Sequence, residues 1–168
     1  MQVVLTGNLM IKPIKGEITH NTEWFGKIDT FVRFSLGSQE FNTKVYNGGG
    51  KTPCWSDVFN VHRQMESTLQ FWVMDSDLLK KDDPIGEGVF DLNQVCFPGG
   101  HYSNNVPIFF KGKPAGTIYL DIQFIPDQMG GMGMNQPYPP NPNMPMGHGN
   151  YPHGHQDHHH DHDHYHKH

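Results

Sequence analysis

A strict alternation of apolar and polar side chains predicts that this chain folds as a β-sheet with one buried face. Within residues 115–125, every second residue is large and apolar: Ile118, Leu120, Ile122 and Phe124. The residues between them carry polar groups: Tyr119, Asp121 and Gln123. Successive side chains of a strand lie on opposite faces, so this segment indicates a strand with one side in a core and one in solvent.

The segments before this strand show the same character. Seven of them are short, rich in β-branched or aromatic residues, and separated by Gly-, Pro- or Asn-containing turns: 9–12, 31–36, 39–45, 58–62, 69–74, 85–92 and 106–110. A short helix is expected only at 92–97. Eight short strands without a long helix predict an all-β fold, an eight-stranded antiparallel β-sandwich.

The apolar residues stop abruptly along the chain. Residues 127–168 contain no Val, Ile, Leu, Phe, Trp or Ala and consist largely of Gly, Pro, Met, Asn and His. Such a segment cannot bury enough apolar surface to offset the entropy of ordering. We therefore expect one domain at 1–126 and a Gly/Pro/Met/His-rich low-complexity tail at 127–168.

Acidic residues crowd the connection that follows the segment 69–74. Four aspartates fall within nine positions: Asp75, Asp77, Asp82 and Asp83. Carboxylates at this density repel one another unless a cation lies between them, and hard divalent cations prefer such oxygen ligands. A solvated acidic turn is the alternative interpretation of this loop alone.

The connection after the first strand contributes two more acids. If both connections emerge at the same end of the sandwich, five carboxylates would share one pocket: Glu23, Asp29, Asp75, Asp77 and Asp83. Five carboxylates in one pocket are difficult to explain without a bound cation.

Four motifs occur in a fixed order along the chain. They are Gly-Lys-Ile-Asp-Thr-Phe-Val at 26–32, Lys-Thr-Pro-Cys-Trp-Ser-Asp-Val-Phe at 51–59, Asp-x-Asp with Asp-Asp-x-Ile-Gly-Glu within 75–87, and Ala-Gly-Thr-Ile at 115–118. Together they resemble the C2 domain, the lipid-binding module also found in conventional protein kinase C and synaptotagmin. The resemblance covers residues 1–126 and implies the type II topology, in which the closing strand follows the calcium loops.

The resemblance also implies a ligand set for calcium, which is formed by the same five acids: Glu23, Asp29, Asp75, Asp77 and Asp83. Backbone carbonyls of Thr22 and Ser76 are expected to help. Glu23 stands where the family prefers Asp, and its extra methylene displaces the carboxylate, so we expect a weak intrinsic affinity for calcium. Thr30 replaces the usual Pro and removes no ligand.

The distribution of charge is consistent with a calcium switch. Residues 1–126 carry eleven Lys/Arg and thirteen Asp/Glu, a net charge of −2. Two bound calcium ions would bring this to +2, so an anionic membrane would repel the loop end before binding and attract it afterwards. The residues expected to contact the membrane are Trp24, Phe25, Leu78, Leu79, Lys80 and Lys81. Trp24 or Phe25 folding back onto the sandwich is the alternative.

Other classes of function are disfavoured. The net charge of −5 and the lack of a basic stripe argue against nucleic-acid binding. No arrangement of residues suggests an enzyme, and Cys54 has no nearby His or basic partner in sequence. Cys54 and Cys96 are expected to be buried free thiols in a reducing compartment. We expect a cytoplasmic protein that becomes peripheral to the membrane when calcium binds.

The tail suggests a separate activity. Ten of the thirteen histidines lie in residues 148–168. The densest group, His158, His159, His160, His162 and His164, could hold Zn²⁺ or another transition metal, although a solvated tail is the alternative. Two functions therefore remain: a calcium-dependent module for anionic phospholipid membranes, or a calcium-independent scaffold whose tail binds a protein partner or a metal.

Overall fold

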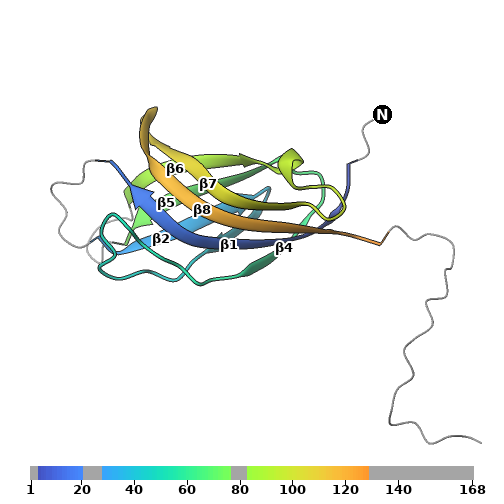
Figure 1. Cartoon of the computed structure of the whole chain (residues 1–168), viewed down its shortest axis with the longest axis horizontal. Coiled ribbons are helices and arrows are strands. Elements are labelled where there is room, and N and C mark those ends of the chain that lie inside the picture. The colour runs from blue at the N-terminus through green and yellow to red at the C-terminus, as the bar shows by residue number, and fades with distance from the viewer. Residues whose placement is uncertain (1–3, 21–27, 77–82, 129–168) are drawn as a thin grey trace, which may run out of the picture. The chain divides into compact units, whose positions relative to one another are not determined.

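The computed structural model describes residues 4–20, 28–76 and 83–128, which form eight antiparallel β-strands (Figure 1). In chain order these are β1 (Gly7–Ile18), β2 (Thr30–Leu36), β3 (Gln39–Asn42), β4 (Phe59–Arg63), β5 (Thr68–Asp75), β6 (Asp83–Asp91), β7 (His101–Phe110) and β8 (Lys113–Pro126). A single 3₁₀ turn, η1 (Leu92–Gln94), follows β6.

The strands form one sheet in the order β3-β2-β5-β6-β7-β8-β1-β4. This sheet curls so that its two halves face each other across the core. The halves, β3-β2-β5-β6 and β7-β8-β1-β4, are joined by a single registered pair, Glu87 with Phe109. The predicted eight-stranded antiparallel β-sandwich is therefore confirmed.

The period-two pattern of the sequence matches the observed burial. In β8, Ile118, Leu120 and Ile122 are completely buried, and in β5 so are Phe71 and Val73. Both strands contribute these side chains to one continuous apolar cluster between the two halves of the sheet. Burial of this apolar surface is the main favourable contribution to folding.

The ends of the elements differ from the expected ranges. The first strand extends from Gly7 to Ile18, because nearly its whole length pairs with β8. The segment expected at 39–45 ends as a strand at Asn42, where the Thr43 hydroxyl turns inward and accepts a hydrogen bond from the Val32 amide at 2.9 Å. The helix expected at 92–97 is reduced to η1, since Pro98 and two glycines follow it closely.

Both cysteines are free, but the expectation that they are buried is wrong. Cys54 is exposed and Cys96 is half-buried. The neighbour of Cys54, Trp55, points into the core and is 7% exposed. Adjacent side chains of extended backbone face opposite ways, so the buried indole directs the Cys54 thiol to solvent.

The two ends of the domain lie together. Gly7 of β1 is the register partner of Pro126 of β8. The following residue, Asp127, donates its amide to the Thr6 carbonyl at 2.9 Å, and its carboxylate lies 2.9 Å from Nε2 of His62. The connections that carry the acidic residues follow the other end of β1, at Ile18, and the end of β5, at Asp75. The two ends of the domain therefore lie opposite these connections.

A candidate cation site at one end of the sheet

Three adjacent strands bring the predicted acidic residues to the same end of the sheet. Thr30 at the start of β2 is the register partner of Asp75 at the end of β5. Asp75 in turn is the partner of Asp83 at the start of β6. Asp29 immediately precedes Thr30, so the backbones of three predicted ligands, Asp29, Asp75 and Asp83, occupy neighbouring positions.

Asp29 is held in place by two backbone groups. The Gly48 amide donates to its carboxylate oxygen Oδ1 at 2.6 Å, and the Ser76 amide donates to its carbonyl oxygen at 2.7 Å. A backbone N–H on one oxygen restricts rotation of the carboxylate without supplying a full positive charge. The second bond also ties Ser76, which follows Asp75, to the start of β2.

The connection between β3 and β4 supports this arrangement. Tyr46 and Thr30 exchange backbone hydrogen bonds of 2.7 and 3.1 Å, and the Trp55 indole donates to the Thr30 carbonyl at 3.3 Å. Gly48 has a φ of 66°, and a Cβ at Gly49 would lie 2.3 Å from the Tyr46 ring. The glycines thus let the chain turn tightly and bring the Gly48 amide to Asp29.

The role of the Gly-rich segment at 47–50 is not evident from the sequence. The segment lacks the Lys-Ser/Thr ending and the following helix of a phosphate loop. A run of glycines shortly after Tyr46 is the only local signal, and it does not identify Asp29 as the partner because the two segments are far apart along the chain.

Several predicted site residues lie outside the described residues. These are Thr22, Glu23, Trp24, Phe25, Asp77, Leu78, Leu79, Lys80, Lys81 and the tail histidines His158, His159, His160, His162 and His164. For Asp83 the structure gives the backbone alone. Across residues 4–20, 28–76 and 83–128, no group of three or more His, Cys, Asp or Glu side chains is close enough to hold a metal ion.

The donor chemistry that is described fits a hard cation. Asp29 and Asp75 are both half-buried, and both would supply carboxylate oxygens, the ligand type that calcium prefers. The Asp29 carboxylate accepts its hydrogen bond from the Gly48 amide, a neutral donor that leaves the negative charge of the acid in place. These two residues and Asp83 could therefore form part of a calcium site.

A two-residue hairpin joins β7 to β8 at the same end of the domain. Phe110 and Lys113 pair across it, and both turn residues have positive φ, 48° at Lys111 and 75° at Gly112. The hairpin is packed against the end of β1, where the rings of His20 and Phe110 have centroids 4.3 Å apart. The sequence alone did not identify Lys111, Gly112 and Lys113 as part of a candidate site.

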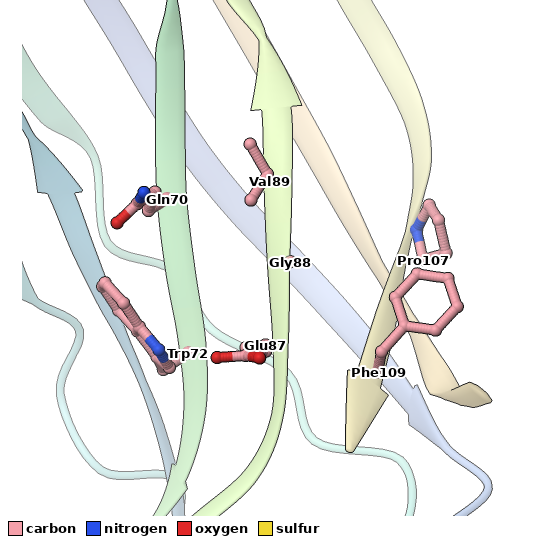
Figure 2. Close-up of a pocket in the computed structure, with 7 residues that line it drawn as sticks. All are labelled: Gln70, Trp72, Glu87, Gly88, Val89, Pro107 and Phe109. Atoms are coloured by element: carbon pink, nitrogen blue, oxygen red, sulfur yellow. The ribbon is translucent and has the colours of Figure 1, made fainter. Parts of the chain in front are cut away.

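A groove of about 460 Å³ crosses the outer face of the sheet between β5 and β7 (Figure 2). It is lined by Gln70, Trp72, Glu87, Gly88, Val89, Pro107 and Phe109. Figure 2 shows the Glu87 side chain extending toward Trp72, with Pro107 and Phe109 on the other side of β6. β6 and β7 are registered at one pair only, which leaves the sheet surface open at this point.

Comparisons with known proteins agree with the fold and with the sequence motifs. The family model described as C2 domain matches residues 7–108. The Arabidopsis thaliana protein "16 kDa phloem protein 2" is 23% identical over 132 residues, which cover 77% of this chain and 89% of that protein. "Elicitor-responsive protein 1" of Oryza sativa subsp. japonica is 34% identical over 102 residues, which cover 56% of each.

A third relative is much longer than this chain. "Multiple C2 domain and transmembrane region protein 2" of Arabidopsis thaliana is 35% identical over 72 residues, which are 42% of this chain but 7% of that protein. Within the described part of the present chain, no helix is long and apolar enough to cross a membrane.

Solved structures show the same architecture. A C2 domain-containing protein from a putative elicitor-responsive gene superposes with a TM-score of 0.68 at 20% identity, covering 78% of this chain and 98% of that one. A C2 domain of plant Extended Synaptotagmin 1 gives a TM-score of 0.64 at 19% identity, covering 76% and 98%. With the family model matching more than half of its length, the chain belongs to the C2 domain family.

Proposed function

We propose that this domain binds anionic phospholipid membranes in response to calcium, and that it is not an enzyme. The observation that supports the proposal is the convergence of Asp29, Asp75 and Asp83 at the ends of three adjacent strands. Glu23 and Asp77 would complete the ligand set from the two connections that begin or end at these strands. Calcium would supply the positive charge that lets this acidic end approach an anionic surface.

The residues around the proposed ligands prepare the site before calcium arrives. Gly48 fixes the carboxylate of Asp29, and the amide of Ser76 holds the end of β5 beside it. Little reorganisation is then needed when the ion binds, which favours affinity. Trp24, Phe25, Leu78 and Leu79 would provide apolar contact with the membrane interface, and Lys80 and Lys81 would contact the head groups.

The proposal is tested by adding calcium to the full chain and following its melting temperature. A ligand that binds the folded state alone stabilises it, by about 2.7 kcal/mol at 100 times the dissociation constant. We expect a rise of several degrees by about millimolar calcium. Asp75→Asn should abolish this rise, because it replaces one of the carboxylates that would bind calcium with a neutral amide.

Glu40→Gln is the matched control, because it removes one negative charge from an exposed position on the edge strand β3. It should leave the calcium response unchanged. An equal melting temperature with calcium and with a chelator would contradict the proposed calcium site. Equal sedimentation with phosphatidylserine vesicles under both conditions would instead indicate a constitutive membrane module.

A further inference from the structure

The turn between β7 and β8 presents two positive charges beside the proposed calcium site. Lys111, Gly112 and Lys113 are all exposed, and they follow an exposed Phe109 and a half-buried Phe110. The Lys111 ammonium lies 5.2 Å from the centroid of the Phe110 ring. An exposed aromatic residue next to lysines is a combination suited to the boundary between lipid head groups and acyl chains.

Lys111 occupies a backbone conformation that is unfavourable for it. Among the described residues it is the only non-glycine residue with positive φ, at 48°. Two-residue hairpins in which both turn residues have positive φ strongly prefer Asn-Gly or Asp-Gly over Lys-Gly. Lysine is less favourable than Asn in this conformation and therefore lowers the stability of the turn. Strain of this kind is often retained at functional positions.

The turn projects beyond Glu87, an acidic residue on the neighbouring strand β6. Glu87 is the register partner of Phe109, whereas the lysines lie farther along, at the turn itself. A hollow of about 260 Å³ separates the hairpin from the start of β6, and it is lined by Pro84, Gly86, Glu87, Phe109, Phe110 and Lys111. A surface that approaches this end of the domain would therefore meet Lys111 and Lys113 before it meets the Glu87 carboxylate.

The position of the hairpin is fixed relative to the end of β1. The amides of Thr19 and His20 both donate to the Ala115 carbonyl, at 2.8 and 3.1 Å, and the His20 ring packs on Phe110. Residue 20 is the last described residue before the connection that carries Glu23, Trp24 and Phe25. The hairpin and the first acidic connection therefore start from one rigid junction.

We propose that the β7–β8 hairpin is a second membrane-contacting element, in which Lys111 and Lys113 bind the phosphate and carboxylate groups of anionic phospholipids. The occupant is an anionic lipid surface because the turn is cationic, exposed and on the same end as the proposed calcium site. This inference extends the proposed function: calcium removes the repulsion from the acids, and the hairpin adds attraction that does not depend on calcium.

The test compares two pairs of lysine substitutions in the full chain. Lys111→Asn with Lys113→Gln removes both charges from the hairpin and relieves the strained turn. Lys12→Gln with Lys15→Gln removes the same charge from the middle of β1, away from the turn. Binding to vesicles of phosphatidylcholine with and without phosphatidylserine is measured by sedimentation, each with calcium and with a chelator.

The hairpin pair should weaken binding to phosphatidylserine vesicles about tenfold to thirtyfold, at about 1 kcal/mol for each lysine near the surface. The β1 pair should weaken it less than about threefold. Lys12 and Lys15 lie opposite Asp121 and Tyr119 of β8, about 20 Å along the strand from Lys113, and this exceeds the Debye length of about 10 Å. The melting temperature of the hairpin pair should be unchanged or higher, so that unfolding cannot explain the loss.

Equal losses for the two pairs would overturn the proposal by assigning the effect to overall charge. Undiminished vesicle binding by the hairpin pair would also overturn the proposal. It would show that the turn does not contact the membrane and would indicate a binding partner other than lipid. The calcium proposal is decided separately, by the difference between calcium and chelator for the unmodified chain. A failure of one proposal is thereby distinguishable from a failure of the other.

Discussion

At the scale of single residues, a buried arginine organises the end of the domain opposite the acidic site. Arg63, at the end of β4, is 4% exposed. Its Nε donates to the Glu66 carbonyl at 2.7 Å, and its Nη1 donates to the Leu5 carbonyl. The segment before β1 and the turn after β4 are thus joined by one side chain. A cation buried to this degree needs hydrogen-bond acceptors, and two carbonyl oxygens accept from its guanidinium group.

Glu66 completes this turn, and its charge state should make stability depend on pH. Partial burial would raise the pKa of Glu66, but the backbone amides of residues 64–66 and Arg63 together hold it below its ordinary value of 4.5. Because the folded pKa is the lower one, the stabilisation is complete above the unfolded pKa. It is lost as the pH falls through the folded pKa.

We therefore expect Glu66→Gln to lower the free energy of unfolding by about 1 kcal/mol at neutral pH, since the charged acceptor is lost. The difference from the unmodified chain should shrink as the pH falls from neutral to well below 4.5, through the lowered folded pKa of Glu66. Urea unfolding across this range provides the measurement, with the exposed Glu40→Gln as a control expected to have little effect. A constant difference across this pH range would show that the charge of Glu66 contributes nothing.

At the scale of elements, the sequence predicts the strands in which apolar and polar side chains alternate. It does not predict strand ends or side-chain partners that depend on hydrogen bonds between distant residues. The apolar series in β8 and β5 was identified because its spacing alone fixes which face is buried. The end of β3 depends on the Thr43 hydroxyl reaching Val32, eleven residues away. His62 lies 2.9 Å from a carboxylate oxygen of Asp127, and His101 lies 2.9 Å from a carboxylate oxygen of Asp121. No local pattern specifies such partners.

Strand β6 illustrates a constraint that period-two reasoning does not reveal. Two of its inward positions are glycines, Gly86 and Gly88. A Cβ at Gly86 would approach side chains of the opposite half of the sheet, and a Cβ at Gly88 would approach a side chain of the neighbouring strand β5. A Cβ at Gly88 would lie 2.3 Å from Cζ of Phe71, whose ring is completely buried. The ring fills the volume that a side chain at this position would otherwise occupy.

Gly88→Ala should therefore destabilise the domain by about 1–3 kcal/mol, because the overpacked Phe71 ring must leave its preferred position. The neighbouring Val89→Ala is the control: Val89 is 59% exposed and should change the stability by less than about 0.5 kcal/mol. Thermal unfolding of both variants without calcium gives the comparison. Equal melting temperatures would mean that the core can accommodate a methyl group beside Phe71.

At the scale of the whole molecule, the acids of the candidate site could be predicted but not the groups that hold them. The spacing of Asp75, Asp77 and Asp83 makes the cluster visible in the sequence, and the sheet places Asp29 beside it. The bond from Gly48 joins a loop and a strand nineteen residues apart, so it depends on the fold. The Lys111–Gly112 turn was missed because Lys is not a residue that signals positive φ.

The net charge of the whole domain leads to the last prediction. Residues 1–126 carry a net charge of −2, and two calcium ions would change it to +2. If this reversal drives association with an anionic surface, then binding in calcium should weaken steeply as salt is raised. The Debye length falls from about 10 Å at 0.1 M to about 3 Å at 1 M ionic strength. Sedimentation with phosphatidylserine vesicles at both salt concentrations measures the effect.

The calcium-induced rise in melting temperature must be followed at both salt concentrations, because it shows whether the ion stays bound. With calcium bound throughout, loss of vesicle binding at high salt would identify charge as the dominant attraction. Binding that persists unchanged would contradict this and would point to apolar insertion, in which Trp24, Phe25, Leu78 and Leu79 are the residues to substitute next. Salt screens charges but does not weaken the burial of apolar surface, so the two contributions respond differently.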